Sequence, residues 1–90
     1  MAFSGTIKVT ASGTRVQAGS KGPGRSFVFK ARHGNVGDCY LGGSDVSSTA
    51  GMALAPGEAL ALEVKDAVSS SQFWADAANN NDQVDFLGLE

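Results

Sequence analysis

The sequence predicts an all-β protein: a single-domain antiparallel β-sandwich of seven or eight short strands, with a jelly-roll or immunoglobulin-like arrangement. Apolar residues alternate with polar ones in most segments, which is the period of a half-buried strand, and helical periodicity is poor. Turn residues recur roughly every 8–12 positions, as they do in sandwiches and barrels. With 90 residues, the chain has room for one domain only, and we expect residues 1–90 to form it.

The first three expected strands follow from alternation and from the glycines between them. Residues 6–10 alternate strictly, a turn at Gly13 ends them, and residues 14–18 form the second strand. Residues 19–25 hold three glycines and a proline, so we expect a solvated hairpin loop there. Residues 27–33 alternate again and place two phenylalanines on the inward side.

The middle of the chain is divided by turns. Residues 34–37 have the composition of a hairpin turn and lead to a short strand at residues 39–41. Another short strand is expected at residues 46–50. The Pro-Gly pair at residues 56–57 favours a turn, because proline presets φ and glycine supplies a positive φ. The strict alternation of residues 59–64 then favours a strand over a helix.

Two more strands are expected near the C-terminus. Residues 72–77 follow a serine-rich stretch, and residues 84–87 close the chain. An asparagine-rich turn at residues 79–81 separates them. Residues 1–5 precede the first expected strand, and we expect them to form a flexible N-terminal arm that is free to order on binding.

No catalytic, metal-binding or membrane-spanning feature is legible in the sequence. His33 is the only histidine and Cys39 the only cysteine, so we expect neither a zinc site nor an internal disulfide. No acid–base or nucleophile pair is recognisable, and no apolar run approaches the length of a membrane span. We therefore expect no enzyme, no cofactor, no metal site and no membrane partner, with synthesis in a reducing cytoplasm.

Alternation leaves several large apolar side chains in outward positions. Small proteins seldom expose a large apolar patch without a use for it, and Tyr and Trp are typical interface anchors. We expect these side chains, together with the phenylalanine of the arm, to form a partner interface. The alternative is that they pack beneath loops or against the second sheet. The candidate interface residues are Phe3, Val28, Tyr40, Trp74, Leu87 and Leu89.

Charge is distributed unevenly along the chain. The first 37 residues carry +6 and the last 53 carry −8. Such a split can mark a nucleic-acid-binding arm, an acidic tail or a dipole that docks onto a charged partner. The overall balance of −2 disfavours nucleic acid, and an antiparallel fold that interleaves the two halves would disperse the charges. The cations concerned are Lys8, Arg15, Lys21, Arg25, Lys30 and Arg32.

A series of turn-and-strand motifs runs from residue 27 to the C-terminal region. The motifs are Phe27-x-Phe29-Lys30-Ala31, Asn35-x-Gly37-x-Cys39-Tyr40-Leu41-Gly42, Pro56-Gly57-Glu58, Leu60-x-Leu62 and Val84-x-Phe86. This pattern resembles small β-sandwich structural proteins of tailed bacteriophages, which occur among head decoration (cement) proteins and tail-associated proteins. The resemblance covers about two-thirds of the chain and lies in fold signatures rather than in a chemical site.

The resemblance implies a virion component. The first hypothesis is a head decoration protein that binds the major capsid protein on the assembled shell and stabilises the assembled state by mass action. We expect a homo-oligomer, because the core is thin and no disulfide compensates. Within this hypothesis, the specific expectation is a trimer at local three-fold axes. One alternative is a tail or fibre protein that recognises a host surface. A second is a small nucleic-acid-binding β-barrel that uses the cations.

Overall fold

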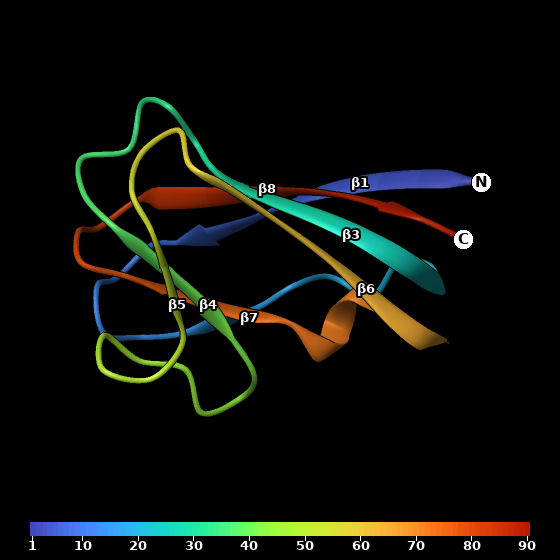
Figure 1. Cartoon of the computed structure of the whole chain (residues 1–90). Coiled ribbons are helices and arrows are strands. Elements are labelled where there is room, and N and C mark those ends of the chain that lie inside the picture. The colour runs from blue at the N-terminus through green and yellow to red at the C-terminus, as the bar shows by residue number, and fades with distance from the viewer.

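The computed structural model describes residues 1–90 and consists of eight strands in two four-stranded antiparallel sheets (Figure 1). Sheet A contains, in order, β1 (Ala2–Val9), β8 (Asp82–Leu89), β3 (Gly24–Ala31) and β6 (Ala59–Val68). Sheet B contains, in order, β2 (Val16–Gln17), β7 (Trp74–Ala77), β4 (Cys39–Gly42) and β5 (Met52–Leu54). A single-turn 3-10 helix, η1 (Ser70–Gln72), lies between β6 and β7. The all-β sandwich predicted from the sequence is confirmed.

The strand order is that of a jelly roll. The strands pair as nested hairpins, β1 with β8, β2 with β7, β3 with β6 and β4 with β5. The chain thus forms one long antiparallel ribbon of paired strands. This ribbon coils on itself, so that β3 also pairs with β8 and β4 also pairs with β7. Eight strands in two packed sheets with this winding define the jelly-roll architecture. Of the two arrangements expected, the immunoglobulin-like one is therefore wrong.

The winding corrects three expectations about local structure. Residues 19–25 and 34–37 do not close hairpins, because the strands on either side of each segment lie in different sheets. Residues 46–50 are not a strand and form a loop with one isolated bridge between Ser47 and Ala50. Strand β5 follows that loop, after Gly51 has turned the chain with a φ of 140°.

Residues 2–5 belong to sheet A, so the expectation of a flexible arm is wrong for them. Strand β1 pairs with β8 along its whole length, from Ala2 opposite Leu89 to Val9 opposite Asp82. The two termini lie close together as a result (Figure 1), and the N-terminal ammonium is 3.1 Å from the Glu90 carboxylate. The sequence hides this because Gly5 interrupts the apolar alternation that otherwise begins at Phe3.

The core between the sheets is built on aromatic rings surrounded by small side chains. The Phe29 ring centroid lies 4.8 Å from that of Phe73 and 5.9 Å from that of Phe86. The inward orientations of Phe27, Phe29 and Ala31 that alternation predicts are confirmed, since all three are buried. The remaining buried apolar cluster consists of Ile7, Val9, Ala18, Cys39, Leu41, Leu54, Ala75, Ala77, Val84 and Phe86.

Gly88 gives the first testable prediction, because β8 passes directly beneath the Phe3 ring. A Cβ atom at this position would lie 2.3 Å from two Phe3 ring carbons and 3.1 Å from a Phe27 ring carbon. We therefore expect Gly88→Ala to lower the free energy of unfolding by about 1–3 kcal/mol, as overpacked cores do. Urea unfolding followed by tryptophan fluorescence measures this.

The matched control for Gly88→Ala is Gly19→Ala, whose new Cβ would meet nothing within 4 Å. We expect this control to be nearly neutral. Adding Phe3→Ala to Gly88→Ala removes the clashing ring, so the double variant should lose less than the two single losses combined. Equal effects of Gly88→Ala and Gly19→Ala would contradict the packing described for Phe3.

Candidate functional site

The six candidate interface residues do not form one surface. Val28, Leu87 and Leu89 face outward from sheet A, as alternation predicts. Tyr40 and Trp74 also face outward but from sheet B, because their neighbours on β4 and β7 are buried in the core. The two groups therefore lie on opposite faces of the sandwich, and the expectation of a single apolar interface is wrong.

Phe3 faces the core, which corrects its place in the expected interface. It is half-buried, and its ring centroid lies 5.8 Å from that of Phe27 in an edge-to-face arrangement. The positions of β1 alternate between inward and outward through Gly5, although glycine lacks an apolar side chain, so that Phe3, Gly5 and Ile7 share the inward face. The feature of the sequence that marks this arrangement is Gly5 at an inward position, where the missing side chain makes room for the Phe86 ring.

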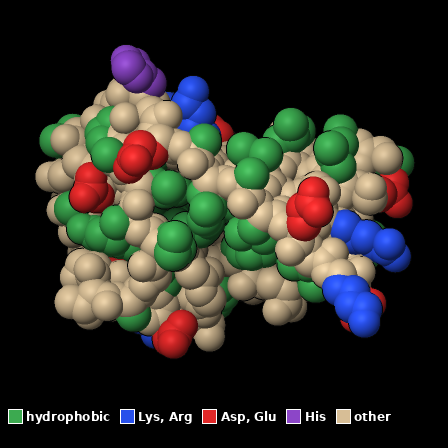
Figure 2. Space-filling view, in the orientation of Figure 1, with side chains coloured by type: hydrophobic (Ala, Val, Ile, Leu, Met, Phe, Trp, Pro, Cys, Tyr) green, Lys and Arg blue, Asp and Glu red, His purple; other side chains and the backbone are tan.

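The outward apolar residues of sheet A form a continuous cluster, here named the sheet A patch. Leu87 lies opposite Val28 on β3, which in turn lies opposite Ala61 on β6. Leu89 lies opposite Ala2 on β1. The exposed fractions of Val28, Leu87 and Leu89 are 42%, 48% and 47%. Strand spacing and rise give this patch an area of roughly 250 Å². Figure 2 shows hydrophobic side chains along the upper edge of the molecule, toward the end that carries both termini.

The other end of the same face is polar, and its charges alternate in sign. Arg32 donates two hydrogen bonds to the Asp85 carboxylate, at 3.1 and 2.7 Å. These bonds hold the pKa of Asp85 below its ordinary value, against the opposing effect of burial, and a hydrogen bond from Thr6 adds to them. Lys30 lies opposite Asp85 in the ladder between β3 and β8.

The nested winding therefore disperses the charge split seen along the chain. Basic strands β1 and β3 flank β8, which carries Asp82 and Asp85. Basic β3 also pairs with β6, which carries Glu63. The +6 and −8 halves interleave, and the expectation of a docking dipole loses its basis. The same interleaving removes the support for a continuous basic surface that would bind nucleic acid.

Cys39 is a buried core residue, as its position in an alternating strand predicts. Burial raises the pKa of its thiol to about 11, and the carboxylates of Asp82, Asp38 and Asp76 contribute further. A thiol in these surroundings stays protonated at neutral pH, and the thiolate is the reactive form. His33 is exposed on the loop after β3 (purple in Figure 2).

A pH-dependent loss of stability follows from the Cys39 thiol. In the folded chain the Cys39 thiol keeps its proton up to about pH 11, whereas an unperturbed thiol releases its proton near pH 9.0. The contribution to stability is therefore present below pH 9.0 and is lost as the pH rises toward 11. We expect Cys39→Ala to show a smaller loss of unfolding free energy across this interval than the native chain. Parallel pH dependences in the two proteins would contradict the burial of the thiol.

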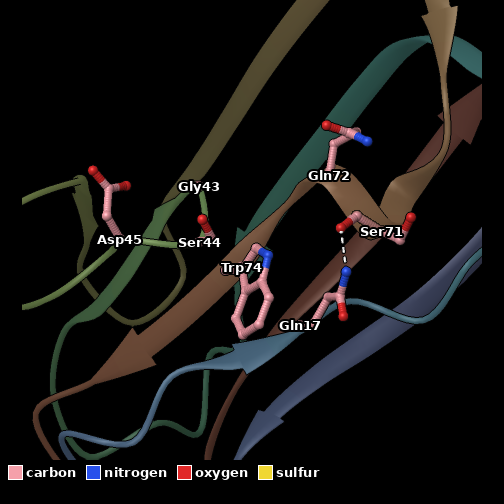
Figure 3. A pocket seen from close by; sticks show the side chains of 7 residues that line it. All are labelled: Gln17, Gly43, Ser44, Asp45, Ser71, Gln72 and Trp74. Carbon is pink, nitrogen blue, oxygen red and sulfur yellow. Dashed lines mark hydrogen bonds between the residues drawn. The ribbon is translucent and has the colours of Figure 1, made fainter.

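The structure has one pocket, a depression around Trp74 on the outer face of sheet B, with a volume of about 670 Å³. Figure 3 shows the indole ring between the Gln17 side chain and the loop that carries Ser44 and Asp45. Alternation identified Trp74 alone. The other lining residues come from segments far apart in the sequence, and only the winding brings them together. They are Gln17, Gly43, Ser44, Asp45, Ser71 and Gln72.

Comparison of the chain with family models, with curated proteins and with solved structures found no match. No group of three or more His, Cys, Asp or Glu side chains is arranged to hold a metal ion. None of the helical structure is long and apolar enough to cross a membrane. The sheet A patch and the Trp74 pocket are two separate surfaces, on sheet A and sheet B respectively.

Proposed function

We propose that this chain is a structural protein of a phage virion, a head decoration protein that binds the major capsid protein on the outside of the assembled shell. The observation that supports it best is the sheet A patch, an apolar cluster on the open face of sheet A toward the end that carries both termini. Apolar patches of a few hundred Å² on monomeric proteins are often functional, and this one lies on a sheet face with its side chains 42–48% exposed. The resemblance of the strand and turn motifs to phage decoration and tail proteins indicates which kind of partner.

The size of the patch predicts weak binding by one copy and strong binding by several. Burying roughly 250 Å² of apolar surface contributes about 6 kcal/mol, which is comparable to the free energy lost when two molecules associate. Three linked patches would bind together much more tightly than any one of them, because the second and third contacts are intramolecular. This arithmetic favours the trimer at local three-fold axes, each copy contributing its own patch.

The test uses the major capsid protein encoded in the same genome, assembled into shells and sedimented with this chain. We expect the native chain to pellet with the shells and to sediment alone as a trimer. Leu87→Asp, which places a charge at the centre of the patch, should reduce shell binding by at least about tenfold, a loss of about 1.4 kcal/mol. The matched control is Met52→Asp, at an apolar position that is 56% exposed outside the patch.

The outcomes of this experiment separate clearly. Loss of binding with Leu87→Asp and full binding with Met52→Asp would support the proposal. A monomer that never pellets with shells would overturn it, and so would equal binding by both variants. A genome with no capsid gene beside this one would also count against it.

A second candidate function, recognition of a host surface from a tail or fibre, is favoured by the Trp74 pocket. Ligand sites are concave and combine apolar or aromatic surface with polar groups that fix the ligand's orientation, and this depression offers Trp74 beside six other lining residues. Imaging of virions that carry labelled chain distinguishes the two candidates. Density over the head shell would support decoration, and density at the tail tip would support host recognition.

A further inference from the structure

The Trp74 pocket has three rigid walls around a single aromatic side chain. Trp74 is the only hydrophobic residue among the seven that line it. Gln17 of β2 lies opposite Trp74 in the ladder between β2 and β7. Gly43, Ser44 and Asp45 form a second wall on the loop after β4, and η1 supplies Ser71 and Gln72 as the third. Figure 3 shows these walls meeting around the indole ring.

The loop that carries Asp45 is anchored in the fold. Val46 is almost completely buried, and its side chain lies 3.1 Å from the position that a Cβ of Gly42 would take. The Val46 amide also bonds to the Gly43 carbonyl at 3.0 Å, and Ser47 and Ala50 exchange two backbone hydrogen bonds. The backbone that carries Asp45 is therefore fixed before any ligand arrives, which reduces the entropy lost on binding.

The η1 wall is fixed equally well. The Gln17 amide nitrogen donates to the Ser71 carbonyl at 2.8 Å, the dashed line in Figure 3. The Ser70 hydroxyl is fully buried, accepts from the Lys21 amide at 2.8 Å and donates to the Gly19 carbonyl. These bonds tie η1 to the segment that follows β2, so the pocket keeps its shape without a ligand.

Several polar groups of the pocket have no partner within the chain. The Asp45 carboxylate, the Ser44 hydroxyl and the Gln72 amide take part in none of the side-chain hydrogen bonds or ion pairs of the structure. Together they offer both donors and acceptors. The indole ring beside them offers an apolar face with negative partial charge, which attracts polarised C–H groups.

These groups select one chemical class of ligand. A pyranose ring has an apolar C–H face and a rim of hydroxyls that both donate and accept. Phosphates and nucleotides are disfavoured, because the pocket carries the Asp45 carboxylate and no cation lines it. Quaternary ammonium groups are typically recognised by cages of several aromatic rings, and this pocket has one.

We propose that the Trp74 pocket binds a neutral saccharide. The Trp74 indole stacks on the apolar face of one sugar ring, and Asp45 with the amides of Gln17 and Gln72 bonds its hydroxyls. The pocket lies on sheet B and the sheet A patch on the opposite face. If the chain decorates the shell through that patch, as proposed above, the saccharide site points away from the shell into solution.

The test follows the indole N–H resonance of Trp74, which is the only tryptophan of the chain. The isolated native protein is titrated with a panel of neutral hexoses, N-acetylhexosamines and their disaccharides, with sialic acid and inorganic phosphate as anionic comparisons. We expect neutral saccharides to shift this resonance at millimolar concentration and the anions to leave it unchanged. Asp45→Asn should weaken binding about tenfold, because it removes a charged acceptor.

The matched control is Asp38→Asn, an equally small change at another exposed loop carboxylate outside the pocket. It should bind saccharide as the native chain does. The proposal is overturned if no neutral saccharide perturbs the indole resonance, if phosphate binds more tightly, or if the two Asn variants behave alike. Because the protein is tested alone, the outcome is independent of whether Leu87→Asp affects shell binding.

Discussion

Replacing Phe29 with alanine is expected to lower the free energy of unfolding by about 3–5 kcal/mol, which is the largest single effect in this chain. The side chain is fully buried at the centre of β3. Its ring packs against Phe27, Phe73 and Phe86, with centroids 4.8–6.0 Å away. A domain of this size has a total stability of roughly 5–13 kcal/mol, so the variant would lose a large fraction of it. Urea unfolding measures the difference.

The neighbouring position supplies the control. Val28 is the next residue on β3 and faces outward at 42% exposed, so Val28→Ala should change the unfolding free energy by less than about 1 kcal/mol. Should Phe29→Ala fail to fold, Phe29→Leu keeps most of the volume and should lose about 1.5 kcal/mol or less. Similar losses of unfolding free energy for the alanine variants of Phe29 and Val28 would contradict the burial of Phe29 in the core.

The contrast between Phe29 and Val28 shows what alternation can predict. A period of two assigns each side chain of a strand to one of two faces. It therefore oriented Val28, Tyr40, Trp74 and Leu87 correctly before any strand was paired. It could not say whether the outward faces of two strands belong to the same sheet. The expected interface failed for that reason, since Trp74 and Leu87 point in opposite directions.

Strand pairing in this fold is set by contacts distant in sequence. Ala2 lies opposite Leu89 and Val9 opposite Asp82, and no local pattern marks such partners. Burial of the inward side chains of β1 and β8, such as Ile7 and Val84, which lie opposite each other, favours this register, and the order of turns alone does not. The Trp74 pocket was hidden for the same reason, because its walls come from residues 17, 43–45 and 71–72.

The jelly-roll winding also explains how so small a chain can offer two independent surfaces. Both sheets are packed on one thin core, so each has an outer face that the other sheet does not cover. Sheet A leaves Val28 and Leu87 in the open, and sheet B leaves Trp74 beside two anchored loops. A substitution on one outer face is separated from the other by the whole core. The capsid and saccharide proposals can therefore be tested in the same protein without interfering with each other.

The loop between β3 and β4, which carries the chain from sheet A to sheet B, is attached to β8 through one buried carboxylate. Asp82, at the start of β8, is only 3% exposed. Its two oxygens accept hydrogen bonds from the backbone amides of Val36 and Gly37, at 2.9 and 3.0 Å. Next to it, the Asn35 side chain accepts from the Gln83 amide at 2.9 Å and donates to the Gln83 carbonyl at 2.8 Å. Together these contacts fasten the loop between β3 and β4 to β8.

Asp82→Ala is expected to lower the free energy of unfolding by about 3 kcal/mol, the second largest effect. It removes two charge-assisted hydrogen bonds and leaves the amides of Val36 and Gly37 without their acceptor, and such bonds contribute about 1.5–3 kcal/mol each before the loop relaxes. Asp82→Asn sharpens the result, because its NH₂ group would face an amide N–H and keep one of the two bonds at most. Asp38→Ala, an exposed carboxylate in the same loop, should be nearly neutral. A thermal midpoint lowered by about 12–24 °C for Asp82→Ala and unchanged for Asp38→Ala would match the two-bond attachment. Equal thermal midpoints for these two variants would mean that the hydrogen bonds from the loop to Asp82 do not contribute to stability.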